Sequence, residues 1–452
     1  MNTMDPRLRM SHLLRRAGFG AAPGELEARL DAGYEATVRE LVEPAQVVDG
    51  LGDLDQQIGG LLDFSNIDDV RVWWIYRMIH SRRPLVEKMA FFWHGHFATA
   101  NNKVGNPYLM YLQNQTFREH GLGQFEALLQ RVARDPAMLV YLDGASNTKG
   151  RPNENFAREV MELFTTGLGP YTETDVQEAA RAFTGWGLNG NGFVFNTNQH
   201  DNQPKRFLGK QGNFDGTEVL STLADHPATA QRLTARLFAF FVYPDPDPKT
   251  LAPFMKVWHD THGDVREVLR AIFLSPVFSS EKAYRALIKS PAEFVIGSIR
   301  SLGGTIAPRQ VAGLMARMGQ DLFNPPSVKG WDGGEGWIST STLFERFNFA
   351  ASITTARGPE GTSHVNPEAV FGGIGPTSAK QMVELAASAL LDGRASEPLR
   401  AAVLRYLETP DPQGPKDGKG KPLALLADNR ALDEKVRGML HLLLSSPEYQ
   451  LS

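Results

Sequence analysis

Hydrophobic residues recur at helical spacing along most of this chain, and 28 prolines and 43 glycines interrupt that pattern at intervals. Runs in which apolar and polar residues alternate, as in half-buried strands, are scarce. The 452 residues are enough for two or three domains, and a hydrophobic content of 42% supports substantial cores. The sequence therefore predicts a mainly α, multi-helical globular protein with long loops rich in Asn, Gly and Trp.

Changes in composition divide the chain into predicted regions. Between Gly185 and Phe214 the helical periodicity gives way to Asn, Gly and Gln, which is typical of a long loop. A stretch rich in Pro, Gly, Lys and Asp near the end of the sequence is typical of a mobile insertion between helices. We expect an N-terminal helical region with the candidate site at 1–190, a long loop at 191–215, a second helical region at 216–350, and a C-terminal helical region at 351–452 with the insertion at 411–421.

Local signals predict where some helices begin. Thr172 and Asp175 have the spacing of a capping box. Asp135-Pro136 breaks the helical pattern between Leu122 and Val140 into two helices. His226-Pro227 opens a further helix.

Charge, cysteine content and hydropathy exclude several classes of protein. The formal net charge is −4, and the sequence has no run of basic residues that could follow a phosphate backbone. Nucleic acid is therefore not an expected partner. Without cysteine there are no disulfides, thiolate metal sites or cysteine nucleophiles. No window approaches the roughly 18 uninterrupted apolar residues of a membrane span. Arg15-Arg16 is not followed by an apolar run of signal-peptide length, so the sequence as it stands predicts a cytoplasmic protein.

The segment Glu87-Lys-Met-Ala-Phe-Phe-Trp-His94-Gly-His96-Phe97 places a carboxylate and two imidazoles in apolar surroundings, where polar groups are costly unless partnered. In a helix, Glu87 and His94 share one face. Gly95 is typical of a helix stop, which would put His96 on a turn or an extended segment. We expect both histidines to converge on one metal ion, with Glu87 as a ligand or as an orienting residue. The alternative is structural, with His94 in the last helical turn and Glu87 as its counter-charge.

Another candidate ligand comes from a later amphipathic helix. Glu154, Arg158 and Glu162 are spaced four residues apart, as in surface ion pairs. Glu159 instead lies at the edge of the apolar stripe and has only weak basic candidates at helical spacing. His94 or a metal ion would supply the missing partner, so we include Glu159 in the predicted metal shell. The alternative is an ordinary helix carboxylate.

His200 and Asp201 lie within the predicted loop at 191–215. An imidazole beside a carboxylate on a loop can complete a metal shell or act as acid and base, so both are candidate catalytic residues. The alternative is a solvated turn. The predicted metal ligands are thus His94, His96, Glu159 and Glu87, and the predicted catalytic residues are His200 and Asp201.

Several segments together resemble one known family. They are Phe92-Trp-His-Gly-His-Phe97, Asp135-Pro-Ala-Met-Leu-Val-Tyr-Leu-Asp143, Pro152-Asn-Glu-Asn-Phe-Ala-Arg-Glu-Val-Met-Glu-Leu-Phe164, Tyr171-Thr-Glu-Thr-Asp-Val-Gln-Glu-Ala-Ala-Arg-Ala-Phe-Thr-Gly-Trp186, His226-Pro-Ala-Thr-Ala230, Lys289-Ser-Pro-Ala-Glu293 and Lys329-Gly-Trp331. Over nearly the whole chain the sequence resembles the bacterial family of unknown function numbered eighteen hundred. The resemblance implies no settled reaction. Similar proteins are often exported and often lie beside a family with sulfatase-like affinities, which implies a sulfatase-like partner and, if the start of the chain is incomplete, a periplasmic or surface location.

Three classes of function remain open. The first is a metal-dependent enzyme, hydrolytic rather than oxidative, in which the predicted His and Glu ligands hold zinc, iron or manganese. The second is a carbohydrate-binding or carbohydrate-active protein without a metal, in which two carboxylates act on a glycan. The third is a scaffold or assembly protein of a bacterial surface system, whose aromatic loops bind a partner. The sequence does not identify a substrate.

Overall fold

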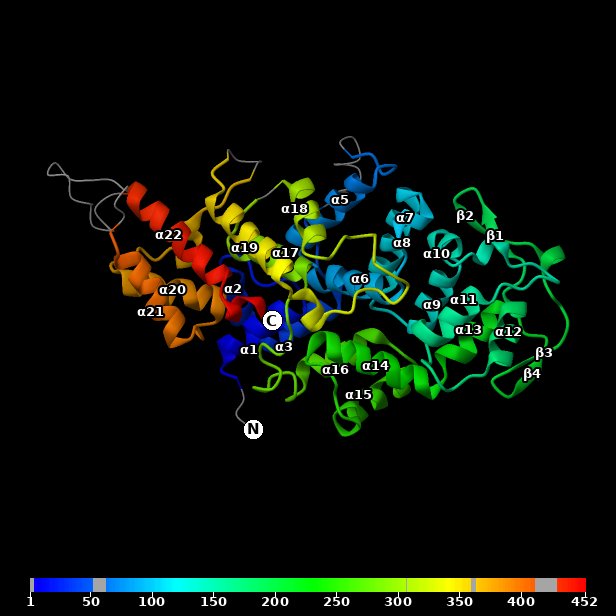
Figure 1. Ribbon diagram of the computed structural model, residues 1–452. Coiled ribbons are helices and arrows are strands. Elements are labelled where there is room, and N and C mark those ends of the chain that lie inside the picture. Colours follow the sequence, from blue (N-terminus) through cyan, green and yellow to red (C-terminus); the bar gives the residue numbers. More distant parts are fainter. Residues whose placement is uncertain (1–3, 52–61, 306, 359–362, 411–428) are drawn as a thin grey trace. The chain divides into compact units, whose positions relative to one another are not determined.

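The computed structural model describes residues 4–51, 62–305, 307–358, 363–410 and 429–452. Helices dominate these ranges, and the strands form only two small two-stranded sheets, so the predicted mainly α fold is confirmed (Figure 1). No helix in the described ranges is long and apolar enough to cross a membrane. The insertion predicted at 411–421 lies outside the described residues.

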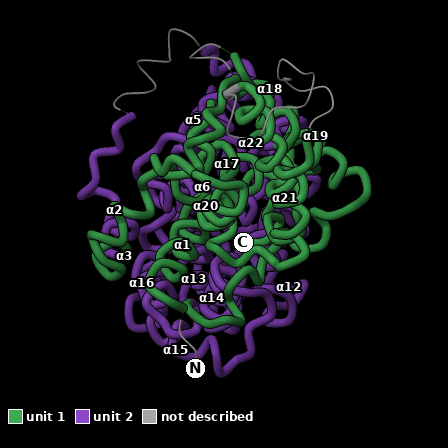
Figure 2. Tube along the Cα trace, turned by 90° about the vertical axis from the view of Figure 1, so that its left-hand side faces the viewer, with its two compact units in different colours: residues 1–37, 279–321, 333–452 green, residues 38–278, 322–332 purple. Residues whose placement is uncertain are grey.

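The chain folds into two compact units, each assembled from segments that are distant in sequence (Figure 2). Unit 1 comprises residues 1–37, 279–321 and 333–452, and unit 2 comprises residues 38–278 and 322–332. Unit 1 thus joins both ends of the chain to a middle segment. The regions with boundaries at 190, 215 and 350 stay a prediction from the sequence.

Unit 2 is helical apart from two hairpins. Its helices are α3 (Tyr34–Val42, which begins in unit 1), η1 (Pro44–Gln46), α5 (Ile67–His80), α6 (Pro84–His96), α7 (Asn101–Val104), α8 (Pro107–His120), α9 (Phe125–Ala133), α10 (Pro136–Tyr141), η2 (Gly144–Ser146), α11 (Glu154–Glu159), the π-helical turn η3 (Val160–Phe164), α12 (Glu173–Ala182), η4 (Thr197–Gln199), α13 (Gly216–Ala224), α14 (Pro227–Phe241), α15 (Pro248–Asp260) and α16 (Val265–Leu274). Helices α14, α15 and α16 pack in succession (green in Figure 1). The largest fully buried side chains of this unit are Trp73, Trp74, Trp93, Lys88, Phe97, Phe117, Phe125, Phe164, Lys205 and Phe207.

Proline and side-chain caps determine where many of these helices begin. Helices α6, α8, α10 and α14 each have proline in the first turn, where its missing N–H costs no hydrogen bond. Asp135 caps α10, so the break predicted at Asp135-Pro136 is confirmed. The capping box of Thr172 and Asp175 opens α12, and His226 caps α14, both as predicted.

Two short hairpins form in and beside the segment predicted as a long loop at 191–215. Strand β1 (Trp186–Asn189) pairs with β2 (Gly192–Phe195), and β3 (Lys205–Phe207) pairs with β4 (Lys210–Gly212), both antiparallel. Gly190, at φ +59°, begins the first two-residue turn, and Leu208 and Gly209 both adopt positive φ in the second. Each strand has only three or four residues, too few for an alternating pattern to be recognised.

The regular elements among the described residues of unit 1 are all helices, apart from isolated bridges. Its helices are α1 (Pro6–Arg16), α2 (Glu25–Ala32), α17 (Pro291–Ser301), α18 (Pro308–Arg317), η5 (Gly334–Trp337), α19 (Thr340–Thr355), η6 (Pro367–Phe371), α20 (Ala379–Leu391), α21 (Glu397–Glu408), α22 (Asn429–Leu444) and η7 (Pro447–Gln450). Helices α20, α21 and α22 contact one another, and α19 packs against α22 (yellow to red in Figure 1). Helix α17 is buried over nearly its whole length.

Candidate functional site

Glu87 lies in the core of unit 2, where it binds two arginines. Its side chain is 1% exposed. Arg118 donates two hydrogen bonds of 2.9 Å, one to each carboxylate oxygen, and Arg77 donates a third of 3.0 Å to Oε1. Burial by itself raises the pKa of Glu87, but Arg118 and Arg77 outweigh it and hold the pKa below its usual value. Both oxygens are therefore engaged by guanidinium groups.

His94 is a buried, neutral hydrogen-bond acceptor. Its Nε2 accepts the backbone N–H of Phe323 at 3.1 Å. The imidazole packs against the rings of Trp74, Phe323 and Trp331. Burial lowers its pKa to about 3, so it carries no charge near neutral pH. His94 fixes the segment 322–332 to helix α6 and neither pairs with Glu87 nor interacts as an imidazolium with the helix dipole.

His96 belongs to the same helix, contrary to prediction. Helix α6 continues through Gly95 and ends at His96, so the predicted helix stop is wrong. Two positions apart on an α-helix, the side chains of His94 and His96 point to opposite sides and cannot converge. His96 Nε2 lies 3.1 Å from the carbonyl oxygen of Phe164, to which it donates. Burial is the main cause that lowers its pKa well below the usual value, followed by the charge of Arg236.

The backbone of Gly95 in the last turn of α6 packs closely against Gly330. A Cβ built on Gly330 would lie 2.3 Å from the carbonyl oxygen of Gly95, and Gly330 has φ +81°. Only glycine permits this approach and this dihedral angle at low cost. Segment 322–332 thus contacts the last turn of α6, which continues past Gly95 to His96.

Glu159 occupies the junction between α11 and the π-helical turn η3. It is half-buried, and burial followed by the charge of Glu162 raises its pKa. Arg158 and Lys329 act in the opposite direction. Arg158 forms ion pairs with Glu154 at 3.1 Å and with Glu173 at 2.8 Å. Glu159 therefore lies beside a second carboxylate and receives no hydrogen bond from either predicted histidine.

The predicted metal ligands are not brought together. In the part of the chain that the structure describes, no group of three or more His, Asp or Glu side chains is placed to hold a metal ion. Glu87 and the two histidines have other partners, and Glu159 lies on another helix. The donor set named from the sequence does not fit a metal centre.

His200 and Asp201 attach the hairpin segment to helix α12. His200 is 5% exposed, and its Nδ1–H donates to the carbonyl oxygen of Thr184 at 2.9 Å. Asp201 accepts a hydrogen bond of 2.8 Å from Arg181, which lowers the pKa of Asp201 to about 2. Neither residue belongs to a solvated turn. The contacts found for them are structural, and the structure places no predicted metal ligand beside them.

A cavity of about 620 Å³ lies within unit 1, at residues that were not candidate site residues from the sequence. This volume falls within the range of small-molecule sites. The cavity is lined by α1, the segment that leads into α2 together with the first turn of α2, one side of α17 along its length, η6 and the glycine-rich segment after it, α20 and η7. All of these segments belong to unit 1.

Lys289 lines this cavity with an amine that has no polar partner. The residue is 6% exposed, and its Nζ has no hydrogen bond or ion pair with any described residue. Nζ lies 3.5 Å from the centre of the Tyr449 ring. The backbone is fixed, because the Lys289 N–H donates to Gln450 at 2.8 Å and its carbonyl oxygen accepts from Arg346 at 2.8 Å. Burial, then the charges of Arg15 and Arg285, lower the pKa of Lys289 well below its usual value.

Arg15 is a second basic residue in the cavity wall. Its Nη1 pairs with Asp392 at 2.8 Å, whereas its Nε and Nη2 are buried and have no hydrogen-bond partner among the described residues. Asp392 also receives a hydrogen bond from Tyr284 at 3.0 Å and lies 3.6 Å from Arg285. Burial would raise the pKa of Asp392, but Arg15 and Arg285 hold it well below the usual value. One carboxylate therefore serves two guanidinium groups.

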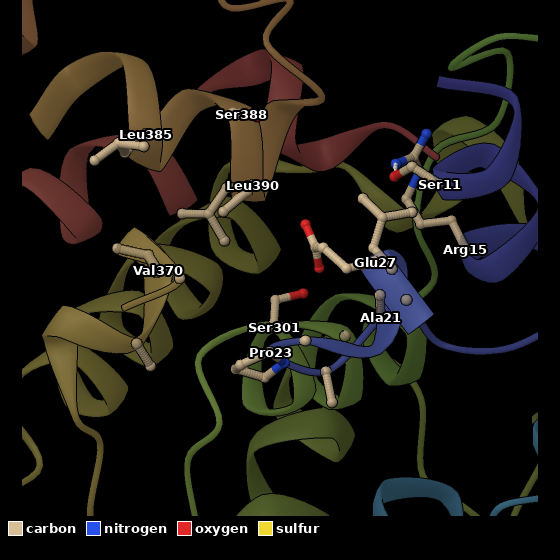
Figure 3. Close-up of a pocket in the computed structure, with 18 of the residues that line it drawn as sticks. Ser11, Arg15, Ala21, Pro23, Glu27, Ser301, Val370, Leu385, Ser388 and Leu390 are labelled. Atoms are coloured by element: carbon tan, nitrogen blue, oxygen red, sulfur yellow. Dashed lines mark hydrogen bonds between the residues drawn. The ribbon is translucent and has the colours of Figure 1, made fainter. Parts of the chain in front are cut away.

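Arg15 and the aliphatic side chains of the cavity wall lie on different sides, with Glu27 between them. Figure 3 shows Ser11 and Arg15 on one side and Val370, Leu385 and Leu390 on the other. Arg7 and Glu27 also line the cavity, but they are exposed and pair with each other at 2.8 Å. The arrangement suits a molecule with one polar end and one apolar end.

The position of Lys289 in the sequence is a signal that could have identified it as a candidate site residue. Lys289 directly precedes Ser290, the N-cap of an apolar helix that begins with proline. A lysine at the entrance of a fully buried helix has no solvent to reach, and this is a reason to single it out. Arg15 has no such signal in the sequence, because Asp392, with which it pairs, and Arg285, which shares that carboxylate, lie far from it along the chain.

The chain belongs to the family described as protein of unknown function (DUF1800), whose model matches residues 12–451. No curated protein matches the sequence. No solved structure matches it either.

Proposed function

We propose that this chain, as a member of a family whose function is unknown, binds a small molecule with an acidic group and an apolar body in the cavity of unit 1. The observation that supports the proposal is a pair of buried basic residues in the cavity wall. Two nitrogens of Arg15 have no hydrogen-bond acceptor among the described residues, and Lys289 is 6% exposed and lines the same cavity. Buried donors without acceptors cost free energy, typically about 1–3 kcal/mol for each group. A bound carboxylate would accept these hydrogen bonds.

The apolar wall of the cavity indicates the chemistry of the part of the ligand that lies away from the acidic group. Val370, Leu385 and Leu390 offer hydrophobic surface and no hydrogen-bond partners from their side chains. An aliphatic or aromatic body would bury this surface, at about 25 cal/mol for each Å² removed from water. A glycan would find few polar partners on that side. The metal-dependent hydrolase predicted from the sequence is not proposed for this cavity, because its candidate residues lie in unit 2.

Calorimetric titration with isocaproate, a branched aliphatic carboxylate, tests the proposal. Its matched neutral ligand is isohexanol, which has the same apolar body without the acid. We expect isocaproate to bind and isohexanol to bind at least about tenfold more weakly, since a hydrogen bond to a charged group contributes roughly 1.5–3 kcal/mol. Equal affinity for the two ligands, or no binding of either to the folded protein, would overturn the proposal.

Two variants locate the binding site. Arg15→Gln should weaken isocaproate binding by about 10- to 100-fold. Arg285→Gln is its control, because Arg285 also contacts Asp392 but does not line the cavity. Ser388→Phe, on helix α20, should fill the cavity without removing a charge. Loss of binding in the Arg285 variant alone, with both cavity variants unaffected, would place the site elsewhere.

A further inference from the structure

The amine of Lys289 is positioned to react with a ligand in the cavity. Its Nζ is held over the face of Tyr449, and the backbone hydrogen bonds on both sides of Lys289 fix the direction from which the side chain enters. No described carboxylate forms an ion pair with it. The lone pair of a neutral amine in this place is free to attack an electrophile.

The charges around Lys289 favour the neutral amine. Arg15 on α1 and Arg285 repel a proton on Nζ, whereas Asp392 and Glu293 attract it. Desolvation by burial is the largest effect, and the net result is a strongly lowered pKa. For each unit by which the pKa is lowered, about ten times more free amine is present at a given pH below it. Desolvated lysines of this kind are the ones that form Schiff bases with carbonyl compounds.

Arg15 indicates a second chemical group that the ligand should have. Its unpartnered Nε and Nη2 suit a carboxylate, which accepts two parallel hydrogen bonds from a guanidinium. Arg15 lies close enough to Lys289 for its charge to act on the amine. A ligand that satisfies both residues has a carbonyl carbon next to its carboxylate, and the apolar wall at Leu385 and Leu390 takes its side chain.

We infer that Lys289 forms an imine with an α-keto acid that has an apolar side chain, while Arg15 holds the carboxylate. This assignment rests on the proposed function and names the ligand class of the same cavity. In the reaction the amine nitrogen attacks the ketone carbon, a C–N bond forms, and the ketone oxygen takes up a proton to give a carbinolamine. The nitrogen then loses its remaining proton, the hydroxyl leaves as water, and a C=N bond results. No oxidant or reductant takes part, and water reverses the reaction.

Reductive trapping tests the inference on the full-length protein. The protein is incubated with α-ketoisocaproate and sodium cyanoborohydride, which reduces an imine to a stable secondary amine, and is then analysed by intact-mass and peptide mass spectrometry. We expect one adduct for each chain, with the mass of the keto acid less one oxygen, located at Lys289. Modification at Lys289 should exceed that at any other lysine by about tenfold or more, as expected for at least one unit of lowered pKa.

Lys289→Met should abolish the adduct. Lys380→Met is its control, because Lys380 is an exposed lysine on α20, the helix that also lines the cavity. The peptide map of the wild-type protein locates the adduct on its own, so the test does not depend on the folding of a variant. Equal labelling of many lysines, or an adduct that survives in Lys289→Met, would overturn the inference.

A non-reactive analogue separates this inference from the proposed function. α-Hydroxyisocaproate has the same carboxylate and side chain but no carbonyl group, so it can bind and cannot form an imine. Binding of both acids without trapping of the keto acid would refute the role of Lys289 and leave the proposed function intact. Absence of binding by either acid would refute both.

Discussion

The Nζ of Lys289 lies 3.5 Å from the centre of the Tyr449 ring, inside a cavity and away from any described ion-pair partner. Lysine in such a place is exceptional, since charged side chains are almost never fully buried unless they are paired. The aromatic face is a weak acceptor for its N–H groups. The buried amine therefore costs stability in the absence of a ligand, and a costly group retained in a cavity indicates binding rather than structural support.

Replacing Lys289 with Met should change how stability depends on pH. The pKa of Lys289 in the folded protein is lowered well below its ordinary 10.5, so between that lowered pKa and pH 10.5 the unfolded chain binds a proton that the folded chain releases. The wild type should therefore gain stability relative to Lys289→Met as pH rises towards 10.5, by up to about 1.4 kcal/mol for each pH unit. Urea denaturation at several pH values measures this difference. A difference that stays constant with pH, as expected for the control Lys380→Met, would contradict the assignment.

Glu87→Gln should destabilise unit 2 strongly. The substitution removes the carboxylate that Arg77 and Arg118 share. It leaves Arg118 without an ion-pair partner among the described residues, whereas Arg77 keeps its pair with Asp49 at 3.0 Å. We expect a loss of about 3–5 kcal/mol in the free energy of unfolding. Glu154→Gln is the control, since the Glu154–Arg158 pair is partly exposed and should contribute less than about 1 kcal/mol. Similar losses for both variants would show that Glu87 and its two arginines contribute no more to stability than an exposed ion pair.

His94→Phe and His96→Phe should lower stability and leave metal content unchanged. Each histidine serves a backbone group, the N–H of Phe323 or the carbonyl oxygen of Phe164, and an unpaired buried group costs about 1–3 kcal/mol. Elemental analysis of the untagged proteins gives the metal content, and the exposed His259→Phe variant corrects for adventitious binding. One equivalent of a transition metal in the wild type that is absent from a folded His94 or His96 variant would restore the metal site predicted from the sequence.

Gly330→Ala should destabilise the protein more than Gly333→Ala. Both glycines have positive φ, at +81° and +75°, so both substitutions cause backbone strain. Only Gly330 has a close neighbour, the carbonyl oxygen of Gly95 at 2.3 Å from the added Cβ, whereas a Cβ on Gly333 would have nothing nearer than 4.0 Å. The midpoints of thermal unfolding measure the difference. Equal midpoints would show that segment 322–332 does not pack closely on α6.

Helix starts were predictable from the sequence because their causes are local. Asp135-Pro136, the pair Thr172 and Asp175, and His226 act on backbone groups within three residues of themselves. The mainly α class followed from periodicity in the same way. The two hairpins were missed because their turns depend on positive φ at single residues, and Leu208 gives no sign of adopting it.

The partners of buried polar groups could not be predicted, because they come from distant segments. Glu87 was correctly identified as a buried carboxylate in need of a partner, but Arg118 comes from another helix, 31 positions along the chain. Helical spacing contains no information on such contacts. The cavity is a stronger example, since Arg15 and Asp392 are separated by 377 positions and become neighbours only when unit 1 assembles.

The crystal structure of the protein with α-hydroxyisocaproate tests the central claim most directly, because it shows the position of the ligand. We predict that the carboxylate accepts hydrogen bonds from Arg15 and that the branched side chain packs against Leu385 and Leu390. An empty cavity at saturating ligand, or a ligand bound in unit 2 beside Glu159, would contradict the claim that the cavity of unit 1 is the binding site.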